Sequence, residues 1–130
     1  MKVDAFMKQL AADYEIKSFD TEEAGKWKIP VEEGENLIIT DLGNGIKIEA
    51  RILDTPRGRE EDLFERMLFA NLFGQGTWGS VLSVDDEAKH IELTRTIDYE
   101  INYKEFKDIV EDFINAVDFW REEALNYQQR

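Results

Sequence analysis

The 130-residue sequence has no cysteine and a single histidine, and its hydrophobic residues never form a long uninterrupted run. Without cysteine there are no disulfide bonds, no thiol nucleophile and no cysteine-based metal site. One histidine, His90, leaves most nucleophilic mechanisms without their usual base and cannot bind a metal alone. A membrane span needs about 18 apolar residues in a row, so no membrane insertion is expected. Residues 1–10 lack the apolar segment of a secretory signal, which favours the cytoplasm.

Positive charge is also scarce, because 16 Lys and Arg stand against 29 Asp and Glu, for a net charge of −13. Such a chain repels phosphate backbones and anionic lipid surfaces, so nucleic acid is not an expected partner. The acidity fits either a plain solvated surface or one matched to a basic or aggregation-prone partner. A hydrophobic content of 42% and an aromatic content of 12% favour a folded core. The length predicts one domain over residues 1–130.

The hydrophobic pattern predicts an α+β fold in the order α-β-β-β-α-β-β-α, an antiparallel twisted sheet with helices packed against it. Residues 17–25 are polar and are predicted to form a loop. Pro30 lacks an N–H donor, which favours an edge position for its strand. The expected helices cover residues 3–16, 59–73 and 102–120, and the expected strands cover residues 26–31, 35–43, 45–54, 80–85 and 90–98.

Local signals support three of these elements. Asn102 and Glu105 have the spacing of a capping box at the start of the last helix. Along residues 46–52, isoleucine and alanine alternate with charged residues, as in a sheet with one covered face. The helix over residues 59–73 is apolar on more than one stripe, so it requires two neighbours, its own sheet and another subunit.

Motifs that would indicate an enzyme are weak. Gly74, Gly76 and Gly79 match a dinucleotide fingerprint, but a helix precedes them and a strand follows, the reverse of the order that binds a phosphate. Residues 85–87 form an acidic turn too short for a calcium loop. Arg95 is expected on an apolar strand face. Its side chain either extends to solvent at the sheet edge or pairs with a nearby acid within the chain. The alternative is an ion pair across an interface. We therefore expect no enzymatic activity, no metal and no cofactor, although abundant carboxylates leave a carboxylate-dependent enzyme formally open.

Residues 70–77, Ala-Asn-Leu-Phe-Gly-Gln-Gly-Thr, resemble the signature of class I type III secretion chaperones, the small acidic effector chaperones of the Tir-chaperone (CesT-like) type. The apolar segment ending in Asp85 and the spacing of Tyr103, Phe106, Phe113 and Trp120 are similar as well. Trp78 and Ser83 depart from the family pattern, where small residues are usual.

This resemblance implies a homodimer in the bacterial cytoplasm, without catalysis. Such a chaperone binds the N-terminal chaperone-binding segment of a secreted effector, keeps it soluble and partly unfolded, and supports its delivery to the secretion apparatus. A secretion ATPase or sorting platform is a further partner that the resemblance allows. Part of the effector segment adds a strand to the sheet, and part fills apolar grooves. The alternative is a protein–protein adaptor or regulator of the same fold that is not tied to secretion.

The resemblance also suggests residues for the two binding surfaces. The same hydrophobic spacing is typical of core residues, so each of these residues can instead belong to the core. The predicted effector-binding residues are Phe6, Leu10, Phe19, Trp27, Ile29, Leu37 and Ile39. The predicted dimer-interface residues are Leu63, Met67, Leu68, Phe73, Val81 and Leu82.

Overall fold

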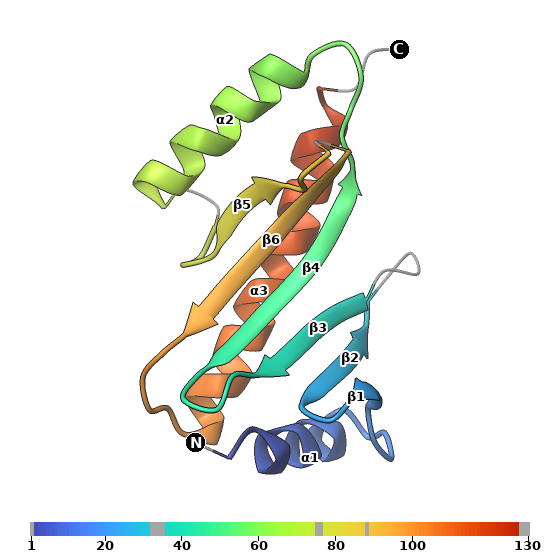
Figure 1. Ribbon diagram of the computed structural model, residues 1–130, viewed down its shortest axis with the longest axis vertical. Helices are drawn as coiled ribbons and strands as arrows, with labels where there is room; N and C mark the ends of the chain where they lie inside the picture. The colour runs from blue at the N-terminus through green and yellow to red at the C-terminus, as the bar shows by residue number, and fades with distance from the viewer. Residues whose placement is uncertain (1, 32–35, 75–76, 88, 128–130) are drawn as a thin grey trace.

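The fold was obtained as a computed structural model, which describes residues 2–31, 36–74, 77–87 and 89–127. Figure 1 shows an elongated molecule in which one long helix runs behind the sheet and two shorter helices lie near its opposite ends. The elements along the chain are α1 (Val3–Asp13), β1 (Asp20–Glu23), β2 (Lys26–Pro30), β3 (Asn36–Asp41), β4 (Ile46–Asp54), α2 (Glu60–Phe73), β5 (Val81–Val84), β6 (His90–Ile97) and α3 (Tyr103–Leu125).

The strands form one six-stranded sheet in the order β1-β2-β3-β4-β6-β5, and every neighbouring pair is antiparallel. This confirms the predicted α+β class with an antiparallel sheet and packed helices. Strands β1 and β5 form the two edges, and β4 lies in the middle because a crossover through α2 places β6 beside it.

The core lies between α3 and one face of the sheet. The predicted alternation in β4 is confirmed, because Ile46, Ile48, Ala50 and Ile52 are all buried. Helix α3 crosses behind β4 and β6 in Figure 1, and it contributes the largest buried side chains. Its core residues are Phe106, Val110, Phe113, Ala116, Val117, Trp120 and Ala124. The predicted capping box is present, with the Asn102 side chain accepting from the Glu105 N–H and the Glu105 side chain accepting in return.

Helix α1 is tied to the start of α3 by aromatic and polar contacts. The ring of Phe6 stacks on Phe106 with 5.1 Å between centroids. The Tyr103 hydroxyl donates to the Asp13 carboxylate, and Lys107 Nζ lies 3.5 Å from the same carboxylate. The hydrogen bond from Tyr103 lowers the pKa of Asp13, whereas burial raises the pKa of Tyr103. These contacts hold α1 in a defined position beside the sheet.

Helix α2 lies beside the edge strand β5, at the end of the molecule away from α1 (Figure 1). Only Leu63, Met67 and Ala70 of this helix are buried. Arg66 adds a tie to α3, because its Nε lies 3.3 Å from a Glu123 carboxylate oxygen and its guanidinium lies over the Trp120 ring. Much of the apolar surface of α2 therefore remains uncovered.

The structure corrects the sequence prediction in the N-terminal third. The first helix ends at Asp13 and not at residue 16, because Glu15 adopts a left-handed φ of 59°. The predicted loop over residues 17–25 contains the strand β1, which makes β2 an interior strand. Pro30 is tolerated there because it lies beyond the last pairing of β2 with β1, at Lys28.

Candidate functional site

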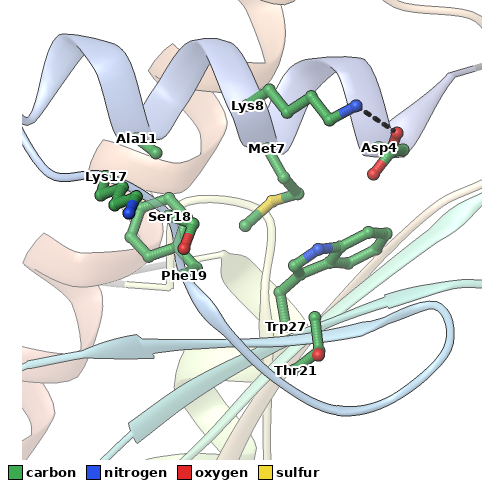
Figure 2. A pocket seen from close by; sticks show the side chains of 9 residues that line it. All are labelled: Asp4, Met7, Lys8, Ala11, Lys17, Ser18, Phe19, Thr21 and Trp27. Carbon is green, nitrogen blue, oxygen red and sulfur yellow. Dashed lines mark ion pairs between the residues drawn. The ribbon is translucent and has the colours of Figure 1, made fainter.

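A pocket of about 240 Å³ opens between α1 and the strands β1 and β2. Figure 2 shows Met7 from α1 and Trp27 from β2 converging on it, with Phe19, the residue before β1, beside them. Met7 and Phe19 are buried, whereas Trp27 is half-buried. We call it the α1–β1 pocket; it is lined by Asp4, Met7, Lys8, Ala11, Lys17, Ser18, Phe19, Thr21 and Trp27.

The rim of the α1–β1 pocket is polar and its inner wall is apolar. Lys8 Nζ lies 3.3 Å from Asp4 Oδ2 one helical turn away, and both side chains are largely exposed (Figure 2). Lys17 and Ser18 line the pocket as well. Such a cavity suits one apolar side chain of a bound segment whose main chain stays near the polar rim.

The predicted effector-binding residues fall into two groups. Phe19 and Trp27 line the α1–β1 pocket, and Phe6 is half-buried against Tyr103 and Phe106. The remaining predicted residues lie in the core with at most 3% exposure: Leu10, Ile29, Leu37 and Ile39. Their part in binding is untested and stays a prediction. Sequence reasoning missed Met7 and Ala11 as pocket residues, although both share the apolar face of α1 with Leu10.

The edge strand β1 runs past this pocket. It pairs with β2 on one side only, so its other side is an edge of the sheet. Asp20, Thr21 and Glu23 are exposed, and the register shifts between Thr21 and Glu23. An edge strand can pair with an added strand, and a bulge and charged side chains restrict which strands fit.

Four large apolar side chains are exposed together on α2. Leu68 and Leu72 are spaced one helical turn apart, as are Phe69 and Phe73, and all are more than half exposed. The rings of Phe69 and Phe73 stack with 5.9 Å between centroids. We call these residues the α2 face. Val81 on the adjacent strand β5 is also exposed, at 55%.

The predicted dimer-interface residues divide in the same way. Leu68, Phe73 and Val81 are exposed and available to a partner. The others are buried within the chain: Leu63, Met67 and Leu82. The structure leaves Phe69 and Leu72 exposed on the same helix face, and the prediction did not name them. The part of all these residues in a dimer interface stays a prediction.

The loop after α2 contains strained backbone. Trp78 has a left-handed φ of 50°, and its ring packs edge-on against Phe119 of α3 at 6.0 Å. Arg95 Nη1 donates to the Trp78 carbonyl oxygen at 2.7 Å. This main-chain bond accounts for the arginine that the sequence placed on an apolar strand face. Of the glycine motif, residues 75 and 76 lie outside the described residues, and α2 precedes and β5 follows the motif as predicted.

One polar cluster connects β6 with the turn before it. His90 Nδ1 lies 2.5 Å from Asp85 Oδ2, and His90 Nε2 lies 3.4 Å from Asp54 Oδ1. The hydrogen bond from His90 lowers the pKa of Asp85 to about 2. Within residues 2–31, 36–74, 77–87 and 89–127, no group of three or more His, Asp or Glu residues is placed to hold a metal. In the same part of the chain, no helix has the length and apolarity to cross a membrane.

Comparison with known proteins gives a family and a fold. The model of the Tir chaperone protein (CesT) family matches residues 5–121. No curated protein sequence matches the chain.

Solved structures share the fold at low sequence identity. A chain of the ExsC–ExsE complex is 15% identical with a TM-score of 0.77, over 95% of this chain and 93% of that one. A chain of the ExoU–SpcU complex from the type III secretion system of Pseudomonas aeruginosa is 13% identical with a TM-score of 0.66, over 98% of each chain. YbjN of E. coli, a candidate transcription regulator, is 16% identical with a TM-score of 0.70, over 95% of this chain and 91% of its own.

Proposed function

This chain belongs to the Tir chaperone protein (CesT) family, and on that premise we propose that it is an effector chaperone of a type III secretion system. It binds the N-terminal chaperone-binding segment of a secreted effector in the bacterial cytoplasm, keeps that segment soluble and partly unfolded, and supports its delivery. The likeness to a chain of the ExoU–SpcU complex, which comes from such a secretion system, supports this proposal.

The observation that carries the proposal is the open edge of β1 beside the α1–β1 pocket. An extended segment can add main-chain hydrogen bonds along β1 while one of its side chains enters the pocket between Met7, Phe19 and Trp27. A disordered segment pays an ordering cost of about 2–5 kcal/mol on binding, so both kinds of contact are required. The acidic surface, with a net charge of −13, keeps the complex soluble.

A second copy of the chain is the proposed cover of the α2 face. Monomeric proteins rarely leave a contiguous apolar patch of large side chains in water. A two-fold dimer would bury Leu68, Phe69, Leu72 and Phe73 of both copies against each other and leave the α1–β1 pockets free at the far ends. The proposed role is that of a chaperone, and it includes no catalytic step and no cofactor.

The test is co-expression with the N-terminal segment of a type III effector from the same organism. Thr21→Arg places a long charged side chain at the mouth of the α1–β1 pocket, and Thr21 is exposed, so the fold should be retained. We expect this variant to recover at least tenfold less complex than the wild type. Thr96→Arg changes another exposed threonine by the same charge on β6 and should bind normally. Equal recovery of complex by both variants would contradict the proposed site.

The likeness to YbjN favours a second candidate, an adaptor or regulator that binds a folded protein. Hydrogen exchange of the complex separates the two candidates. Protection of main-chain amides along β1 together with an extended partner segment supports the chaperone. Protection of a flat surface by a folded partner, with no protection added along β1, supports the adaptor.

A further inference from the structure

The two edges of the sheet differ in whether their outward-pointing N–H and C=O groups already make hydrogen bonds within the chain. Strand β5 (Val81–Val84) pairs with β6 on one side, and successive residues of an antiparallel strand direct their N–H and C=O groups alternately toward the partner and away from it. Groups that point away form a template on which another strand can pair. On β5 the outward-pointing groups include those of Leu82, because both of them bond to a residue outside the sheet.

That residue is Asn71 of α2. Its Nδ2 donates to the Leu82 carbonyl oxygen at 2.8 Å, and its Oδ1 accepts from the Leu82 N–H at 2.8 Å. A primary amide can present an N–H donor and an oxygen acceptor side by side, as a neighbouring strand does with its N–H and C=O groups. Next to it, the Ser80 N–H donates to the Thr77 carbonyl oxygen at 3.0 Å. The centre of the β5 edge therefore has its hydrogen bonds made within the chain.

We propose that Asn71 closes the β5 edge to strand addition and thereby directs an extended partner to the β1 edge. The closing of the β5 edge by Asn71 is a property of the single chain and does not depend on an effector. The binding of an effector at the β1 edge rests on the proposed function. A second copy that covers the α2 face then joins through side chains and adds no strand to β5.

The β1 edge is restricted in a different way. Asp20 and Glu23 are exposed on it, so two β1 strands of separate copies repel each other. A neutral or basic extended segment meets no such repulsion. Both edges of the sheet are thus protected against pairing with the sheet of another copy, β5 by a side-chain amide and β1 by its charge. A strand of different composition can be added only at β1.

The first experiment measures self-association of Asn71→Ala, which leaves both main-chain groups of Leu82 unpaired. It is made in a Leu72→Asp background, so that the α2 face contributes no association of its own. We expect a mass by light scattering that rises with concentration to at least twice that of the background protein. Asn115→Ala changes an exposed asparagine of α3 in the same background and should leave the mass unchanged. A folded Asn71→Ala protein of constant mass overturns the proposal.

The second experiment uses the unmodified chain and so does not depend on how a variant folds. Hydrogen exchange of the Leu82 amide should be at least 100-fold slower than in an unstructured peptide of residues 77–87, because Asn71 holds it. Exchange at the peptide rate overturns the proposal. Neither experiment includes an effector, so a failure of effector binding is a separate result and concerns only the proposed function.

Discussion

Trp78 and Gly79 turn the chain from α2 into β5 with two consecutive left-handed residues, at φ 50° and 84°. A residue with a side chain pays roughly 1–2 kcal/mol to adopt this conformation. The bond from Arg95 Nη1 to the Trp78 carbonyl oxygen offsets part of that cost. A Cβ atom on Gly79 would lie 2.5 Å from Arg95 Nη1, so an alanine there would displace the guanidinium from its bond to the Trp78 carbonyl oxygen.

Gly79→Ala should therefore destabilise the protein by more than backbone strain alone. We expect a loss of about 2–4 kcal/mol, which combines left-handed strain with displacement of a charged hydrogen-bond donor. Gly43→Ala is the matched control, because Gly43 has a similar φ of 87° and nothing within 4 Å of the added Cβ. Urea unfolding measures both. Equal losses in the two variants would show that Arg95 does not constrain Gly79.

Asp85 supplies the pH-dependent prediction. Its carboxyl accepts from the His90 ring and from the Lys89 and His90 N–H groups, which lowers its pKa from 3.8 to about 2. A lowered pKa means that the ionised group stabilises the fold above about pH 4, and that this contribution disappears between about pH 4 and pH 2. We expect the gap in urea midpoint between wild type and Asp85→Asn to be constant from pH 5 to 7 and to shrink below pH 4.

Asp86→Asn controls for the loss of one negative charge from the same turn. A gap for Asp85→Asn that stays unchanged down to pH 2 would show that the hydrogen bonds of Asp85 add nothing to stability through its ionised form.

Among the elements, α2 is the one that the proposed dimer would cover. Its buried side packs on β5 and α3, and the α2 face is left to solvent, with Leu72 exposed by 72%. Leu72→Asp should retain the fold, because the residue makes no core contact in the single chain. It should convert a dimer to a monomer, since losing one buried leucine in each copy costs about 3–6 kcal/mol per dimer.

Light scattering at micromolar concentration measures this change. Leu42→Asp is the control, because it places the same charge on an exposed leucine in the turn between β3 and β4. A Leu72→Asp protein that keeps the mass of the wild type would mean that the α2 face is not the dimer interface.

The elements that the sequence predicts correctly have local causes. The capping box of Asn102 and the alternation from Ile46 to Ile52 follow from short-range geometry, and the structure contains both. Strand β1 was missed because Asp-Thr-Glu-Glu has little strand propensity and forms a strand by pairing with β2.

The candidate site could be predicted only in part, for a different reason. A periodic pattern marks an apolar face without showing what covers it. Leu37 and Ile39 are fully buried in the core, whereas Phe19 and Trp27, chosen by the same reasoning, line the α1–β1 pocket. Similarly, Leu63 and Leu68 are close in sequence on one helix, and only Leu68 is exposed. Tertiary packing decides which of these apolar side chains are buried and which are exposed, and the residue spacing within one segment does not predict that packing.

For the whole molecule, the charge and the α2 face act against each other. The net charge of −13 opposes association of copies at neutral pH without preventing the proposed dimer, and the sequence isoelectric point is about 4.4. Near that pH the repulsion vanishes and exposed apolar surface drives association. We expect turbidity to reach a maximum close to pH 4.4, and Leu72→Asp to lower that maximum at equal concentration. A maximum of the same height in both proteins would show that the α2 face does not drive the association.

The three tryptophans stand at three separate places in this fold. Trp27 lines the α1–β1 pocket, Trp78 lies exposed after α2, and Trp120 is 1% exposed in the core. Replacing any two with phenylalanine leaves one tryptophan, whose emission, excited at a wavelength that the four tyrosines do not absorb, reports on a single place. Entry of a partner side chain is read from Trp27, contact near the α2 end from Trp78, and loss of the core from Trp120. The chain thus contains its own optical probes for unfolding, for the proposed binding of an effector segment and for the proposed dimer contact, and none of them requires an added dye.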